Sequence, residues 1–146
     1  MSNWFLTKIS YSTIMEDGKE KKTTEEYLID AITFTEAESR IIKEMEPRLD
    51  GEFIIQSIKR EKINEIFYDE TSDKWFKAKV AFISFDEEKG TEKETKVTMY
   101  TQAENLNQAR TSLEEGMKGT MYNWKIKKLE ETKIYEVIKY KNEEEV

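Results

Sequence analysis

Two pairs of tryptophan and lysine lie at matching places in the sequence and could bind a nucleic acid. Trp4 is followed by Lys8, and Trp75 by Lys79, at the same spacing within segments that alternate apolar and polar residues. In an extended strand such residues share one face. Rings on which bases stack, flanked by cations that meet phosphates, suit single-stranded nucleic acid. The alternative is a sheet covered on both faces, with each Trp in a second small core and each Lys paired with a carboxylate.

A second set of cations lies in the last segment of each half of the chain: Lys59, Arg60, Lys127 and Lys128. We expect the two pairs to occupy the same place in two related halves and to form one strip across a twofold axis. The alternative is that they mark solvated strand edges, where Lys discourages aggregation. Together with the Trp and Lys pairs, these are the predicted binding residues for a nucleic acid or a partner protein.

Catalytic chemistry has few candidates in this chain. The sequence contains no Cys and no His, which removes thiolate nucleophiles, the usual zinc ligands and the commonest general base at neutral pH. Glu65 and Glu136 lie within apolar strand endings, and paired carboxylates can act as general acid and base. A salt bridge from each to the first-strand lysine of its own half, Lys8 or Lys79, is the simpler account. We therefore predict no enzyme activity, no catalytic residue, no metal site and no cofactor.

The elements that must position these residues occur twice. The segments Trp4–Tyr11 and Trp75–Phe82 alternate with period two, which predicts strands with one buried face. A polar connector and a second strand follow in each half, and these strands end at Ala31 and Ala103. Asp17-Gly18 marks the first connector as a hairpin turn.

A helix is predicted next in each half from the same two signals. Thr33 with Glu36, and Asn105 with Gln108, fit the capping box that opens a helix. Apolar residues then recur at helical spacing and predict one face that packs on a sheet. These residues are Phe34, Ala37, Ile41 and Met45 in the first half, and Leu106, Ala109, Leu113 and Met117 in the second.

The last segment of each half runs from about Glu52 to Tyr68 and from about Asn123 to Tyr140. Each begins with alternating residues, and an apolar residue, Ile58 or Leu129, then breaks the alternation. A bulge, or a turn between two short strands, would account for the break.

The two halves together predict an α+β fold. We expect a tandem duplication of a ββαβ(β) unit that forms a pseudo-twofold single domain with an antiparallel sheet and two helices. Repeat 1 spans about residues 3–70, repeat 2 about 74–140, and an acidic tail occupies 141–146. One such unit buries little apolar area alone, so each should complete the core of the other. One sheet or two, and helices on the same side or on opposite ends, are both compatible with the sequence.

Composition limits the classes of partner. Lys and Arg number 24 against 31 Asp and Glu, for a net charge of −7, which argues against indiscriminate binding to nucleic acid or to an anionic membrane. A local basic surface is still compatible with this total. The sequence shows neither a secretory leader nor an apolar run of about 18 residues. We therefore expect a soluble protein of the cytoplasm with no membrane partner.

Several segments resemble an uncharacterised domain family of Bacteroidota and their phages over nearly the whole chain. They are Trp4-Phe5 with Thr7-Lys8, Thr33–Glu38, Gly51-Glu52-Phe53 and Glu114–Met121. The resemblance implies a bacterial or phage source and an intracellular setting in a bacterial host cell. It transfers no catalytic residues.

The function that these features predict is binding without catalysis. We expect a small binding protein of phage or mobile-element origin whose ligand is single-stranded nucleic acid. One alternative is a protein–protein interaction module, such as an inhibitor of host defence or a structural accessory, whose partner is another protein or a second copy of the chain. Another alternative is a sponge for small nucleotides.

Overall fold

The computed structural model describes residues 3–139 and shows an α+β fold of eight strands and two helices within that range. The predicted acidic tail, 141–146, lies outside the described residues. In chain order the elements are β1 (Asn3–Ile14), β2 (Glu20–Ala31), α1 (Phe34–Met45), β3 (Phe53–Glu61), β4 (Glu65–Phe67), β5 (Lys74–Asp86), β6 (Thr91–Ala103), α2 (Leu106–Gly116), β7 (Asn123–Glu131) and β8 (Ile134–Ile138).

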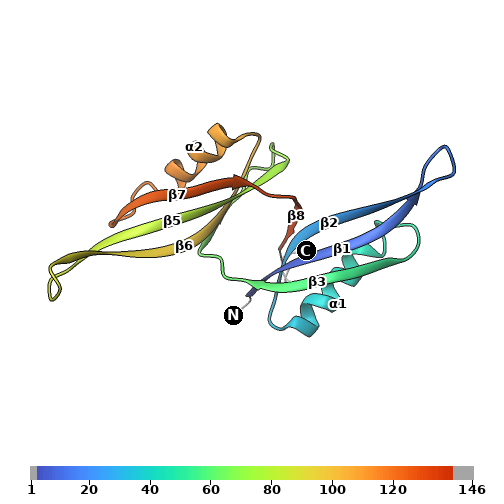
Figure 1. The fold of residues 1–146 in the computed structure, drawn as a ribbon, viewed down its shortest axis with the longest axis horizontal. Coiled ribbons are helices and arrows are strands. Elements are labelled where there is room, and N and C mark those ends of the chain that lie inside the picture. The colour runs from blue at the N-terminus through green and yellow to red at the C-terminus, as the bar shows by residue number, and fades with distance from the viewer. Residues whose placement is uncertain (1–2, 140–146) are drawn as a thin grey trace, which may run out of the picture. The chain divides into compact units, whose positions relative to one another are not determined.

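The strands form two four-stranded sheets, each packed against a helix of its own (Figure 1). One sheet has the order β3-β1-β2-β8 and the other β4-β6-β5-β7. The longer strands pair antiparallel, whereas β8 pairs parallel with β2, and β4 parallel with β6. The expectation of an antiparallel sheet is therefore corrected to two mixed sheets.

The two sheets belong to two units, and the shortest strand of each unit comes from the other half of the chain. Unit 1 contains β1, β2, α1, β3 and β8, and unit 2 contains β4, β5, β6, α2 and β7. Each half of the chain thus gives its last strand to the unit built by the other half. Ile138 of β8 joins the core of unit 1, and Phe67 of β4 packs against the core of unit 2. This exchange is the form in which each half completes the core of the other.

The local signals of the sequence are confirmed. Gly18 closes the first hairpin with φ 82°, a conformation that glycine adopts without steric cost. The Thr33 hydroxyl accepts a hydrogen bond from the Glu36 N–H at 3.1 Å, and the Asn105 side chain accepts one from the Gln108 N–H at 2.8 Å. Both helices therefore begin where their cap residues predict.

The predicted irregularity in the last long strand is also confirmed, and it occurs at the same place in both units. The register of the β1–β3 pair shifts between Lys8 and Ile9, and that of the β5–β7 pair between Lys79 and Val80. The extra residue is Gln56 in β3 and Lys127 in β7. A bulge of this kind bends the strand and redirects the side chains beside it.

Each unit has an apolar core between its helix and its sheet. In unit 1 the buried residues include Phe5, Ile29 and Ile41, and in unit 2 they include Val80 and Leu113.

No helix among residues 3–139 is both long enough and apolar enough to cross a membrane. Both halves of the chain have the same order of elements, while the duplication itself stays a prediction.

Candidate nucleic-acid interface

Strand register corrects one predicted site. Arg60 of β3 lies opposite Phe5, and the residue opposite the equivalent Phe76 is Glu131 of β7. The acidic pair 130–131 therefore stands where unit 1 has the basic pair 59–60. The expectation that Lys59-Arg60 and Lys127-Lys128 occupy the same place is wrong, because the bulge at Gln56 and at Lys127, and not similarity of charge, sets the register.

The structure brings three of the predicted residues together in unit 2. Lys79 of β5 and Lys128 of β7 are direct cross-strand partners, and Lys127 is the bulged residue next to them. Register partners share a face of a sheet, so this face also holds Lys96 and Lys125, which both lie opposite Ala81. We call these five exposed lysines, 79, 96, 125, 127 and 128, the lysine face.

Carboxylates balance the lysine face only in part. Glu94 of β6 lies 3.0 Å from the Lys125 ammonium and 3.4 Å from that of Lys127, across the middle strand. The hydrogen bond from Lys125 lowers the pKa of Glu94, and the same bond raises the pKa of Lys125. Lys128 lies 3.5 Å from Glu130, while Lys79 donates a hydrogen bond to the neutral Thr98 hydroxyl at 3.1 Å. The expected pairing of Lys79 with a carboxylate is replaced by this bond, and positive charge predominates.

The tryptophans do not form the predicted stacking surface. Trp75 is only 3 % exposed and meets Tyr68 edge to face, with ring centroids 5.7 Å apart. Trp4 is half-buried. For Trp75 the alternative of a sheet buried on both faces is correct, and base stacking on this ring is excluded in this structure.

Sequence reasoning missed the exposed aromatic ring of this sheet. Phe85 is 63 % exposed and lies on β5 in the same alternation as Lys79 and Ala81, which places it on the side of the lysine face. Tyr122, just before β7, is 68 % exposed. The signal for Phe85 was present, because a residue an even number of positions from Lys79 on one strand shares its face.

The predicted residues of unit 1 do not make a comparable surface. Lys8 is exposed, but its partner on β3 is Ser57, and the bulged Gln56 donates a hydrogen bond to the Ser10 hydroxyl at 2.8 Å. Lys59 and Arg60 are exposed near the end of β3, where the Arg60 guanidinium lies 5.9 Å from the centre of the Phe5 ring. Lys59 lies opposite Leu6 and so shares a face with Lys8, but the residues directly opposite Lys8 are Ser57 and Glu26, whereas Lys79 has Lys128 directly opposite.

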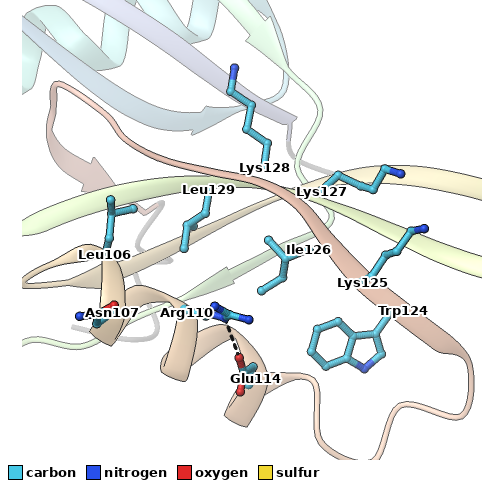
Figure 2. Close-up of a pocket in the computed structure, with 10 residues that line it drawn as sticks. All are labelled: Leu106, Asn107, Arg110, Glu114, Trp124, Lys125, Ile126, Lys127, Lys128 and Leu129. Atoms are coloured by element: carbon cyan, nitrogen blue, oxygen red, sulfur yellow. Dashed lines mark hydrogen bonds and ion pairs between the residues drawn. The ribbon is translucent and has the colours of Figure 1, made fainter.

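A groove of about 710 Å³ lies on the other side of β7, between that strand and α2 (Figure 2). Trp124, Ile126 and Leu129 point from β7 toward the helix, and Leu106 and Arg110 line the groove from α2. Lys125 and Lys127 point to the opposite side of the strand. The sequence signal was the run 124–128, in which an aromatic or apolar residue alternates with lysine.

Comparison with known proteins gives a family. A family model described as a domain of unknown function, DUF4494, matches residues 3–140. The chain belongs to this family. The match spans both units, so that both sheets and both helices belong to one DUF4494 domain. No curated protein and no solved structure matches the chain.

Unit 1 of this DUF4494 domain holds a polar cluster in its core region. The Glu25 carboxylate accepts a hydrogen bond from the Tyr11 hydroxyl at 2.6 Å and another from the Tyr27 hydroxyl. The hydrogen bond to Glu25 raises the pKa of Tyr11 to about 12, and burial, with the bond to Glu25, raises that of Tyr27. Unit 2 has the apolar residues Phe82, Val97 and Met99 at the equivalent register positions.

Glu136 also departs from its predicted role. Its carboxylate forms an ion pair with Arg48, next to α1, and not with Lys79. This pair lies in unit 1 because β8 is exchanged, which the sequence pattern of β8 does not reveal. Within residues 3–139 no group of three or more carboxylates is placed to hold a metal ion.

Proposed function

We propose that this DUF4494 protein is a non-enzymatic binding protein whose lysine face takes the phosphate backbone of a single-stranded nucleic acid. The observation that carries the proposal is the direct pairing of Lys79 with Lys128. Like charges directly opposite each other destabilise a sheet. A surface that keeps such a pair, next to further lysines and in a chain of net charge −7, is well suited to an anionic ligand.

The geometry favours a ligand bound mainly through its backbone. The lysines come from three adjacent strands, β6, β5 and β7, so their ammonium groups spread over a patch. Strands lie about 4.8 Å apart, and such a patch can meet several successive phosphates of an extended chain. Phe85 offers one ring for a base. We therefore expect little sequence specificity and a strong dependence on salt.

The proposal is tested by fluorescence anisotropy of a labelled oligothymidylate at about 50 and 200 mM salt. Lys79→Gln with Lys128→Gln should weaken binding at the lower salt. The matched control is Lys59→Gln with Arg60→Gln, which removes the same charge from unit 1 and should leave binding unchanged. Absence of binding to the natural chain at about 50 mM salt, where phosphate contacts are strong, would exclude the proposal.

The setting is part of the same proposal. The sequence resemblance to a family of Bacteroidota and phages, together with a chain that has no cysteine, supports action in the reducing cytoplasm of a bacterial host cell. An origin in a phage or mobile element is proposed on the resemblance alone.

A further inference from the structure

The edge of β7 is a candidate site for a second kind of partner. In the described sheet β7 is the last strand and pairs with β5 on one side. A strand at such an edge presents a row of backbone N–H and C=O groups that can pair with an added strand. The edge runs from Asn123 to Glu131 and is interrupted by the bulge at Lys127.

The two sides of this edge differ in chemistry. On the side of α2 the groove of about 710 Å³ has an apolar floor of Trp124, Ile126 and Leu129, with Leu106 and the Arg110–Glu114 ion pair across from them (Figure 2). Leu106 is 51 % exposed. On the other side lie the ammonium groups of Lys125 and Lys127. A strand added here would direct alternate side chains into the apolar groove and toward the lysines.

We propose that β7 accepts an extended protein segment as an added strand, and that this segment alternates apolar and acidic side chains. The apolar residues fill the groove beside α2, and the acidic residues meet the lysines on the opposite side. This site goes beyond the proposed nucleic-acid function, because it adds the groove and the backbone edge of β7 to lysines that it shares with the lysine face.

The charges on β7 distinguish this partner from a second copy of the chain. Two antiparallel β7 strands placed edge to edge with Ile126 at the centre would set Lys125 opposite Lys127, and like charges across strands are unfavourable. The same lysines attract an acidic segment. Lysines and a bulge on an edge strand are devices that suppress self-pairing, and here they leave the edge open to a partner of opposite charge.

The test uses a labelled peptide of about eight residues, long enough to span about 27 Å, that alternates Leu or Val with Glu. A control peptide of the same composition places its apolar residues in one block and its glutamates in another. We expect the alternating peptide to bind at least about ten-fold more tightly, a difference that corresponds to about 1.4 kcal/mol. Equal affinity for the two peptides would overturn the proposal.

Two further measurements separate strand addition from other modes of binding. Methylation of the alternate amide nitrogens that face β7 should abolish binding, because it removes the main-chain donors; undiminished binding of the methylated peptide would contradict strand addition. Leu106→Glu should weaken the peptide about ten-fold, while Thr35→Glu, an acidic substitution in the first turn of the other helix, should not. Both substitutions place a carboxylate near a helix N-terminus, where it favours folding.

Measuring oligonucleotide and peptide binding by the same variants separates this site from the lysine face. Lys79→Gln should weaken an oligothymidylate and spare the peptide, and Leu106→Glu should do the reverse. If Leu106→Glu weakens the oligonucleotide and the alternating peptide fails to bind, the groove belongs to the nucleic-acid site and the proposal is wrong. If the natural chain binds the alternating peptide but not the oligonucleotide, the proposed nucleic-acid function is wrong and strand addition is still supported.

Discussion

The edge strands β3 and β7 have the same backbone pairing and differ in their side chains. β3 pairs antiparallel with β1 and β7 with β5, and both edge strands have a bulge at the same register position. Of the five lysines of the lysine face, only Lys79 has a lysine counterpart in unit 1, Lys8. The others correspond to Thr24, Ile54, Gln56 and Ser57. Equivalent scaffolds therefore carry a concentrated charge in one unit only, and the candidate site belongs to unit 2.

The cores show the opposite distribution of polar groups. Unit 1 holds Glu25 between the hydroxyls of Tyr11 and Tyr27, whereas unit 2 is apolar at these positions. A carboxylate in a partly buried place is costly unless its hydrogen bonds are satisfied. The two units thus show that the fold accepts either solution, and the difference can be tested by exchanging residues between them.

The largest effect is expected from transferring the β3 residues to β7. Lys125→Ile, Lys127→Gln and Lys128→Ser together remove three cations and should weaken oligothymidylate binding about 100-fold near 0.1 M salt, since each phosphate contact on a single strand contributes about 0.7 to the salt slope. The reciprocal change in β3, Ile54→Lys, Gln56→Lys and Ser57→Lys, should strengthen binding. Unchanged affinity of the β7 variant, measured by fluorescence anisotropy, would show that oligothymidylate binding does not depend on these three lysines.

The next effect concerns the polar cluster of unit 1. Glu25→Val alone leaves two tyrosine hydroxyls without their acceptor and should lower the free energy of unfolding by about 1–3 kcal/mol. Adding Tyr11→Phe and Tyr27→Met, the residues of unit 2, should restore most of that loss. Urea unfolding followed by tryptophan fluorescence measures both variants. A triple variant no more stable than the single one would show that the cluster stabilises unit 1 in a way that apolar packing does not replace.

A smaller effect is expected where the exchanged strand β4 meets α2. A Cβ atom at Gly116 would collide with the ring of Phe67, so Gly116→Ala should destabilise the protein by about 1 kcal/mol despite the higher helix propensity of Ala. Combining it with Phe67→Leu, which makes room, should lessen the penalty of the glycine substitution. Equal penalties in both backgrounds, from thermal unfolding, would show that the two residues are independent.

The smallest effect is a loss of stability at alkaline pH that arises in unit 1. The pKa of Tyr11 is raised from the ordinary 10.0 to about 12, so the stabilisation that accompanies this shift is present below about pH 10 and is lost as the pH rises toward 12. Tyrosinate absorbance should show late titration of this residue. In Glu25→Gln, which removes the carboxylate charge, titration should begin at lower pH; an unchanged curve would show that Glu25 does not set it.

Local features of this fold could be predicted from the sequence, because they depend on neighbouring residues. The caps at Thr33 and Asn105, the hairpin at Gly18 and the bulge before Ile58 follow from residue type and spacing. The exchange of β4 and β8 could not be predicted, since alternation identifies a strand and not its partner. The burial of Trp75 could not be predicted either, because an alternating pattern shows that a strand has two faces and does not show what covers each face.

The candidate site was predicted in part. Lys79, Lys127 and Lys128 were identified and lie together, but Lys96 and Lys125 join them only through cross-strand register. Lys59 and Arg60 were included because their charge resembled that of residues 127–128. Register is a three-dimensional property, and a one-residue bulge is enough to misalign two strands compared by composition.

Amide chemical shifts of the nitrogen-15-labelled protein can show whether nucleic acid binds unit 2 and not unit 1. On addition of oligothymidylate at about 50 mM salt, we expect the largest shift changes in β5 and β7 near Lys79 and Lys128. The amides of β1 and β3 near Lys8 and Ser57 should change little. Shifts confined to β1 and β3, or no shifts at all, would contradict this expectation.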